Sequence, residues 1–215
     1  MGKRDGITIG AKITSMQAQV VPVGTQADGT SVINQYQVAY HLAADTWSGY
    51  FAQNQDWDNG KNNTTYFLLE RWYEASYSSS YTKMLPLWSS VKEDAEKSNF
   101  PEAFALAQIL KISAWHKATD MFGPIPYKQA GKGLLRVPYD SQEEVYQAFF
   151  DDLTAAIAVL QTKYNQGGAL LPNYDAVYAG DVGKWIKYAN SLMLRLAMRI
   201  RYADPAKAQQ YAEQA

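Results

Sequence analysis

The sequence predicts an all-α protein in which amphipathic helices are joined by loops. In most segments of the 215-residue chain, apolar residues repeat every three or four positions, which is the spacing of one helical face. Ser, Asp or Asn precedes several of these segments, and Gly or Pro follows them, as expected at helix ends. Every well-defined element is helical, so we treat residues 1–215 as a single helical domain.

The first part of the chain predicts two helices separated by a turn-rich loop. Residues 7–20 carry a mixed apolar pattern that Pro22 should end. Residues 24–30 are rich in turn formers and predict a loop. From Val32 to about Phe51, alanines and bulky apolar residues share one side, which predicts the second helix.

A long helix should cover residues 67–97, with an interruption at Pro86 because proline lacks a backbone N–H. Asn99 with Glu102 has the spacing of a capping box and should open the next helix. The apolar face of that helix comprises Ala103, Phe104, Ala107, Leu110, Ala114, Trp115 and Ala118. It should end near Gly123, which tolerates the left-handed exit conformation.

Beyond Gly123, the prolines at 124 and 126 predict an extended exit, and residues 131–139 predict a loop. Ser141 and Glu144 form a second capping box. The apolar residues of the following helix are Val145, Phe149, Leu153, Ile157 and Leu160, and Gly167 and Gly168 close it.

Two further helices are predicted near the C-terminus. Asp181 is the expected N-cap of the first, whose apolar face comprises Trp185, Ala189, Leu192 and Leu196. Arg195, Arg199 and Arg201 stand where cations favour a helix C-terminus. Asp204 and Pro205 should open the last helix, inside which the sequence stops at Ala215.

The amino-acid composition excludes several classes of function. Twenty basic and 21 acidic residues leave a net charge of −1, which argues against a nucleic-acid partner. The absence of cysteine excludes a disulfide framework and a thiolate metal site or nucleophile. The sequence has no run of about eighteen apolar residues, and no signal-type apolar stretch follows Met1.

Residues suited to catalysis are scarce. His41 and His116 lie inside predicted helices and outside any metal-ligand or nucleophile motif, so we expect ordinary helix positions. Paired carboxylates occur at Asp56/Asp58, Glu93/Asp94, Glu143/Glu144 and Asp151/Asp152. Three pairs are adjacent helical residues that point in different directions, whereas a glycosidase needs two carboxyls about 5 to 9 Å apart.

The sequence also contains no motif that would bind a cofactor or a metal ion. Residues 56–67 superficially resemble a calcium loop, but its glycine comes one position early and Phe67 stands where a bidentate Glu is needed. No phosphate-binding glycine loop is present. We therefore expect no cofactor, no metal ion and no enzymatic activity.

Binding has better support, because aromatic residues are concentrated in one part of the chain. Of 29 aromatic residues, 13 fall between Tyr36 and Trp88. Within that stretch, residues 53–65 form the most polar segment, which predicts an exposed loop. Aromatic rings stack on the flat C–H faces of sugars, and amide and carboxylate groups hydrogen-bond their hydroxyls.

Trp57 stands inside this polar loop and is the leading candidate for ligand contact. The candidate ligand-binding residues are Asn54, Asp56, Trp57, Asn59 and Tyr66. The alternative is that Trp57 folds back and caps the loop against the helices. Trp47, Trp72, Trp88, Trp115 and Trp185 have helical spacing and are expected in the core.

Two motifs resemble those of a known family. Residues 120–127 (DMFGPIPY) and 180–190 (GDVGKWIKYAN), the latter continuing through Ile200, resemble the SusD/RagB family of Bacteroidetes. The resemblance implies a tetratricopeptide-like antiparallel helix array with long loops, wound as a right-handed superhelix. It also implies a lipid-anchored, surface-exposed outer-membrane protein that holds nutrients, usually glycans, for a SusC-like TonB-dependent transporter.

The resemblance also places ligand residues in N-terminal loops, in agreement with the 53–66 region, and in a later segment beyond this chain. Family members carry an export signal and an acylated cysteine, which we expect Met1 and Gly2 to replace here. We further expect the chain to be truncated at its C-terminus. Two other functions stay open: a helical protein-interaction scaffold without sugar binding and, with less support, a carbohydrate-active enzyme.

Overall fold

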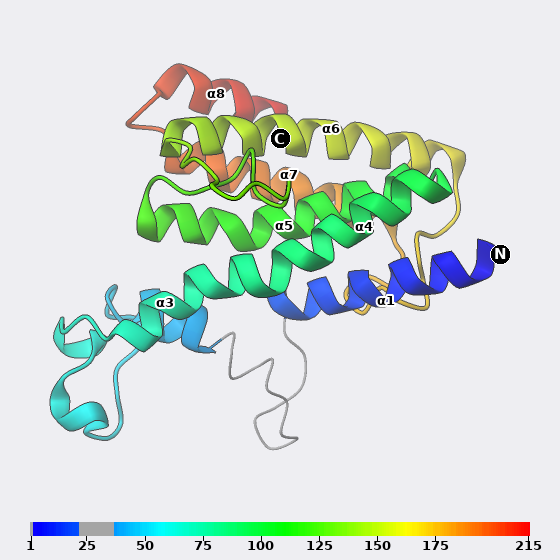
Figure 1. Ribbon diagram of the computed structural model, residues 1–215. Helices are drawn as coiled ribbons and strands as arrows, with labels where there is room; N and C mark the ends of the chain where they lie inside the picture. Colours follow the sequence, from blue (N-terminus) through cyan, green and yellow to red (C-terminus); the bar gives the residue numbers. More distant parts are fainter. Residues whose placement is uncertain (1, 22–36) are drawn as a thin grey trace.

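The computed structural model describes residues 2–21 and 37–215, and within these residues the protein is built from helices alone (Figure 1). The only β-type pairing in that part of the chain is an isolated antiparallel bridge between Ile125 and Asp140. The all-α prediction is therefore confirmed.

The α-helices run back and forth as antiparallel neighbours (Figure 1). They are α1 (Gly2–Val20), α3 (Glu70–Ser78), α4 (Leu85–Ser98), α5 (Pro101–Phe122), α6 (Gln142–Gln166), α7 (Val182–Arg199) and α8 (Pro205–Gln214). Shorter 3-10 or π segments are η2 (Gln37–Asp45), η3 (Trp57–Gly60), η4 (Asn63–Thr65) and η5 (Ser79–Met84). Consecutive helices from α4 to α8 pack against each other, as expected for a tetratricopeptide-like array.

Helix α5 is the centre of the bundle. It packs against α1, α4, α6 and α7, and every residue from Ala105 to His116 is buried. A helix that is covered on all sides must be apolar around most of its circumference, and α5 is rich in Ala, Leu and Ile. The core is therefore organised around one helix, with Trp115 and Trp185 fully buried within it.

Helices α3 and α4 form one long helical run with η5 between them (Figure 1). Pro86 lies in the first turn of α4, where its missing N–H costs least, and the π turn of η5 directly precedes that turn. The predicted interruption at Pro86 is thus confirmed as a local change of helix type. The run begins at Glu70 and not at residue 67.

Most predicted helix ends are confirmed. Ser141 and Glu144 form the reciprocal hydrogen bonds of a capping box at the start of α6. The Asp181 and Asp204 side chains accept hydrogen bonds from backbone N–H groups in the first turns of α7 and α8. Gly123 ends α5 with a φ of 71°.

The predicted capping box at Asn99 is wrong. Asn99 is the left-handed C-cap of α4, with a φ of 50°. Phe100 takes the N-cap position of α5 without a side-chain hydrogen bond, and Pro101 opens that helix. Since Asn is favoured both as an N-cap and in the left-handed conformation, and the two helices are two residues apart, the sequence pattern fitted either role.

Near the N-terminus, the predictions are confirmed in part. The helix expected at 7–20 exists and begins earlier, at Gly2. The loop predicted at 24–30 lies outside the described residues. Of the helix predicted from Val32 to Phe51, residues 37–51 are described: Gln37–Asp45 form the π-helix η2, and the predicted continuation to Phe51 is wrong because turns follow Asp45.

The two motif segments are anchored by buried aspartates. The Asp140 carboxylate accepts hydrogen bonds from the backbone N–H groups of Tyr127 and Lys128, which fixes the extended exit after α5. Asp175 accepts hydrogen bonds from the Gly180 N–H, the Trp185 indole and the Gln17 amide. These bonds tie the loop before α7 to both α7 and α1.

Candidate functional site

Residues 37–72, called the arm here, project from one end of the helix bundle (Figure 1). The arm contains η2, η3, η4 and the first residues of α3, and it includes the polar loop predicted at 53–65. That loop is ordered by two short 3-10 turns and by hydrogen bonds from asparagine side chains.

Asn62 organises the inside of the loop. Its side chain is fully buried, its Nδ2 donates to Gln53 Oε1 at 2.6 Å and to the Trp57 carbonyl at 2.8 Å, and its Oδ1 accepts from the Thr64 N–H at 2.9 Å. A buried amide loses little on folding only when its donors and acceptors are satisfied. Asn62 therefore holds the turn at Trp57 in a fixed position.

Asn63 ties the loop to both neighbouring helices. Its Nδ2 donates to the Leu42 carbonyl of η2 at 2.9 Å, and its Oδ1 accepts from the Leu69 N–H at the start of α3 at 3.0 Å. Asn63 is fully buried, as Asn62 is. The prediction of an exposed loop is therefore wrong for these two residues, because their amides act as an internal frame for the exposed ones.

Left-handed backbone positions are concentrated in the same loop. Asp58, Asn59 and Tyr66 have φ values of 54°, 54° and 59°. Asp and Asn adopt this conformation readily, but Tyr does so rarely, so the loop holds Tyr66 in a strained conformation. Arg71 donates two hydrogen bonds to the Asp58 carboxylate, at 2.8 and 2.7 Å, and thereby fastens the loop to α3.

The structure places the predicted site residues in two groups. Asn54, Asp56 and Asn59 are exposed, and among the described residues no protein group hydrogen-bonds their side chains. Tyr66 is 74% exposed, and its ring lies 5.5 Å from the Trp47 ring, centroid to centroid. These four side chains are accessible to a ligand.

Of the two alternatives for Trp57, the structure favours the one in which the indole folds back toward the helices. The indole is half-buried and meets the buried Trp72 ring edge-on, with centroids 6.3 Å apart. Trp57 therefore packs back toward α3 and leaves only part of its ring open. Trp72, Trp115 and Trp185 are buried as predicted, whereas Trp88 is half-buried, as is Trp47, which lies in a turn after η2.

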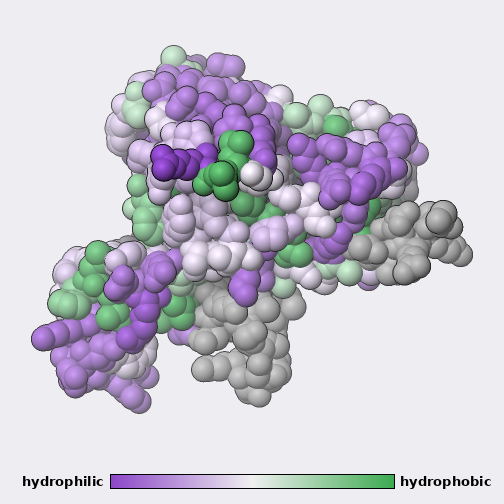
Figure 2. All heavy atoms as spheres, in the orientation of Figure 1, coloured by the Kyte–Doolittle hydropathy of each residue, from purple (hydrophilic) through white to green (hydrophobic). Residues whose placement is uncertain are grey.

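Sequence reasoning missed several exposed apolar side chains on the arm. Tyr50 is 87% exposed, and Phe51 stacks on His41 with centroids 5.5 Å apart and planes 12° apart. Phe67 and Leu68 are also largely exposed. Figure 2 shows hydrophobic side chains on the arm, at the lower left, beside strongly hydrophilic ones. Aromatic pairs at 50–51 and 66–67 flank both ends of the polar loop, and this pattern could have identified them.

Neither a metal site nor a membrane span finds support in residues 2–21 and 37–215. In that part of the chain, no group of three or more His, Asp and Glu side chains is placed to hold a metal ion. No helix there is both long enough and apolar enough to cross a membrane. The arm has exposed aromatic rings and polar side chains that no described residue hydrogen-bonds, and these groups are suited to ligand contact.

Fold and arm together define an all-helical antiparallel scaffold with a projecting aromatic arm. The family model described as SusD-like, Susd and RagB outer membrane lipoprotein, matches residues 1–215. The chain therefore belongs to the SusD/RagB family. No curated protein matches the sequence significantly.

Solved structures of the same family match almost the whole chain. A chitin-binding SusD homologue from Flavobacterium johnsoniae is 32% identical with a TM-score of 0.83, and the match covers 97% of this chain and 42% of the homologue. A SusD homologue from Bacteroides uniformis is 36% identical with a TM-score of 0.83, covering 96% and 41%. The chain thus spans about two-fifths of the length of these structures.

Proposed function

We propose that this protein binds a nutrient glycan through the arm, without changing the ligand chemically. The exposed Tyr66 ring, held in a left-handed backbone position beside Trp47, is the observation on which the proposal chiefly depends. Tyr66 takes this conformation as the C-cap of η4, and strained backbone positions of this kind cluster at ligand-contacting sites. Membership of a family that includes a chitin-binding homologue supports a glycan as the ligand.

In this mechanism, the aromatic rings supply flat contact surfaces for sugar C–H faces. Tyr66, together with the open part of Trp57, would stack on the sugar. The side chains of Asn54, Asp56 and Asn59 form no hydrogen bond with any described residue and are available for the sugar hydroxyls. Because Asn62 and Asn63 fix the loop beforehand, little conformational entropy is lost on binding.

We also propose that the full-length protein is anchored by a lipid at the outer surface of the outer membrane and hands the glycan to a SusC-like TonB-dependent transporter. The family description as an outer membrane lipoprotein supports the location. A purified transporter of this class, mixed with the full-length protein, should co-elute with it in detergent. Separate elution at micromolar concentrations would contradict this part of the proposal.

Binding itself can be tested on the chain as it stands. Oligosaccharides of several classes, chito-oligosaccharides among them, should be titrated calorimetrically against the unmodified chain, Tyr66→Ala and Trp57→Ala. Tyr202→Ala is the control, because Tyr202 is 84% exposed and follows α7, outside the arm. Removal of a stacking ring costs about 0.5–1.5 kcal/mol, so we expect affinity to fall about two- to tenfold in both arm variants.

The outcomes separate the candidate functions. Selective binding of one oligosaccharide, lost in Tyr66→Ala and kept in Tyr202→Ala, supports glycan recognition by the arm. Equal affinities of all variants would exclude the arm as the site. If no oligosaccharide binds while a protein partner does so through the same rings, the interaction-scaffold function is supported. Release of new reducing ends would indicate an enzyme.

A further inference from the structure

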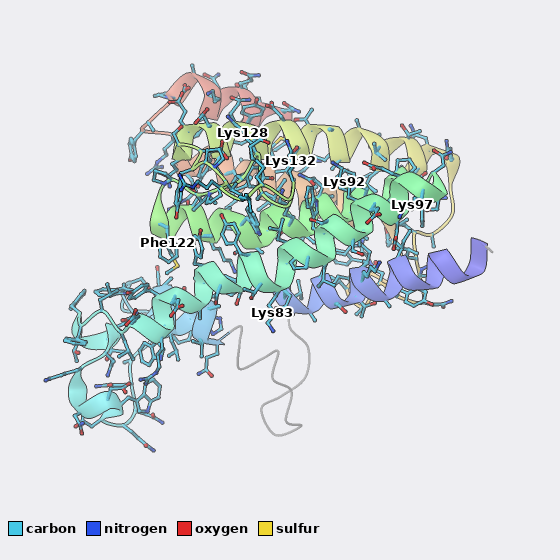
Figure 3. All side chains as sticks on the ribbon, viewed as in Figure 1. Lys83, Lys92, Lys97, Phe122, Lys128 and Lys132 are labelled. Carbon is cyan, nitrogen blue, oxygen red and sulfur yellow. The ribbon has the colours of Figure 1, made fainter. Side chains whose placement is uncertain are left out.

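A second concave site lies in the helix bundle, away from the arm. It is a pocket of about 780 Å³ between α4, α5, α6 and the segment 127–132 that follows α5. Figure 3 shows Lys92, Lys128 and Lys132, three of its lining residues, on the same side of the molecule. Pockets of this size hold small organic ligands.

Lys111 lines this pocket from the central helix α5 and is only 3% exposed. Its ammonium nitrogen lies over three aromatic rings, at 3.9 Å from the Trp88 centroid, 4.0 Å from that of Tyr127 and 5.0 Å from that of Trp115. No described residue accepts a hydrogen bond from it or forms an ion pair with it. Ring faces alone do not satisfy the three N–H donors of a buried ammonium group.

A chain of hydrogen bonds engages one oxygen of the nearby Asp152 carboxylate. The Trp88 indole donates to Gln108 Oε1 at 2.6 Å, and Gln108 Nε2 donates to Asp152 Oδ2 at 2.5 Å. The Tyr127 hydroxyl donates to the same oxygen at 2.8 Å. These bonds fix the Trp88 and Tyr127 rings around Lys111, so the ammonium site is preformed, and no described residue takes up its N–H donors.

The charged groups around Lys111 do not neutralise its ammonium group, so an anion can still bind there. Burial lowers the pKa of Lys111 to about 7; the negative charge of Asp152 on α6 opposes this shift, and the positive charge of Lys92 on α4 adds to it. At the mouth, Lys128 is paired with Glu144 at 2.9 Å, while Lys132 forms no ion pair with any described residue. Glu93 and Glu96 also line the mouth, and Lys92 approaches Glu96 at 4.0 Å. An incoming carboxylate would therefore meet its strongest attraction at the buried ammonium.

The remaining wall suits the body of a flat, partly apolar ligand. Its apolar lining residues include Pro101, Phe104, Ala105, Ala148, Ala156 and Val159. Polar groups lie at the rim, where Ser89, Glu93 and Lys132 can meet hydroxyl groups. A sugar ring with one apolar face, several hydroxyls and one carboxylate matches the apolar wall, the polar rim and the Lys111 ammonium group.

We propose that this pocket is a second ligand site, separate from the arm, and that it binds an acidic sugar by placing the sugar carboxylate against the Lys111 ammonium. Each oxygen of a carboxylate can accept hydrogen bonds from the donors that Lys111 presents to the pocket. The site recognises a uronic acid residue of an oligosaccharide and discriminates against the neutral sugar of the same ring configuration.

The test uses disaccharides that differ only at C6. Digalacturonate and a glucuronate-containing disaccharide, each with its neutral counterpart, should be titrated calorimetrically against the 215-residue chain, Lys111→Met and Lys83→Met. Lys83 is an exposed lysine of η5 outside the pocket, so its substitution controls for the loss of one surface charge (Figure 3). Lys111→Met keeps an unbranched chain of similar length and removes only the cation.

We expect at least one acidic disaccharide to bind at least about tenfold more tightly than its neutral counterpart, and Lys111→Met to weaken that binding about 30-fold or more. Lys83→Met should stay within about twofold of the unmodified chain. Tyr66→Ala should leave the affinity for the acidic disaccharide unchanged. A result against binding in the pocket can therefore be distinguished from a result against binding by the arm. At pH 8, binding should take up close to one proton, because the carboxylate favours the charged form of Lys111.

Three results would overturn the proposal: acidic and neutral disaccharides binding equally, Lys111→Met binding as the unmodified chain does, or no acidic disaccharide binding at millimolar concentrations. Loss of binding in Tyr66→Ala would move the site to the arm and also contradict it. If Lys111→Met does not fold, proton uptake by the unmodified chain decides, since its absence at pH 8 excludes a contact between the carboxylate and Lys111.

Discussion

The helix bundle and the arm are held together by different kinds of interaction. In the bundle, α5 is buried among apolar side chains from four other helices, and its large residues, such as Trp115 and Leu110, are fully buried. In the arm, two buried asparagines hold the backbone in place, while aromatic rings such as Tyr50 and Tyr66 face solvent. The arm thus combines buried amides with exposed aromatic rings, whereas the bundle buries mainly apolar side chains.

This difference separates stability from recognition. Apolar burial is non-directional, and a continuous core tolerates changes at its surface. The arm depends on a few directional hydrogen bonds, and it leaves apolar rings available because its own structure does not need to bury them. We therefore expect substitutions in the bundle to change global unfolding and substitutions in the arm to change local order or binding.

The largest expected effect is that of Trp115→Ala in the bundle. The Trp115 indole is fully buried, donates to the Ser80 carbonyl at 3.1 Å, and contacts the Tyr81 and Tyr127 rings. Its removal should lower the free energy of unfolding by about 3–5 kcal/mol. Urea denaturation followed by far-UV circular dichroism measures this loss. A loss below about 1 kcal/mol would show that α5 is not the centre of the core.

The same contrast explains which parts could be predicted from the sequence. Helix spacing and caps are local signals, so α6 with its Ser141 capping box and α7 with its Asp181 N-cap could be predicted. The role of Asn99 was predicted wrongly because two helix ends, which compete for the same residue type, lie two residues apart.

The candidate site could be predicted only as a region. Composition identified the polar loop, but the burial of Asn62 and Asn63 depends on contacts with η2 and the start of α3 that no local pattern encodes. The Lys111 pocket was not predicted at all. Its parts come from α4, α5, α6 and the 127–132 segment, and a lysine within an apolar helical face has no sequence signal that separates it from an exposed one.

Asn63→Ala should have the next largest effect, confined to the arm. Its amide joins the Leu42 carbonyl and the Leu69 N–H, and truncation leaves both groups without this partner. We expect a local loss of about 2 kcal/mol, visible as faster hydrogen exchange in residues 40–69 and unchanged exchange in α5. Asn54→Ala is the matched control, since Asn54 is exposed, lies in the same loop and does not have a left-handed backbone. Equal acceleration in α5 would show that arm and bundle unfold as one unit.

Lys111→Met should give a difference in stability that depends on pH. The pKa of Lys111 is lowered by burial from 10.5 to about 7, so between these values the unfolded chain binds a proton that the folded chain does not. The stability of the unmodified chain therefore rises with pH in this window, by about 1 kcal/mol per pH unit, relative to Lys111→Met. Urea denaturation at pH 6, 7, 8 and 9 measures the slope.

The exposed Lys83→Met serves as the control for this slope, because it removes a lysine that lies outside the pocket. A flat difference for Lys111→Met would mean that the Lys111 ammonium keeps its hydration in the folded protein. The buried cation is thus a cost to the bundle below pH 7, and an anionic ligand in the pocket would offset it.

The smallest effect on folding should be that of Tyr66→Ala. The side chain is 74% exposed and contacts Trp47 only at a tilted angle, so the free energy of unfolding should change by less than about 0.5 kcal/mol. Thermal denaturation of Tyr66→Ala and of Trp115→Ala measures the smallest and the largest expected loss of stability. A large loss in Tyr66→Ala would mean that the ring supports the arm structurally. An unchanged midpoint, together with weakened glycan binding, is the result expected if the arm exposes its rings for a ligand and the bundle alone carries the fold.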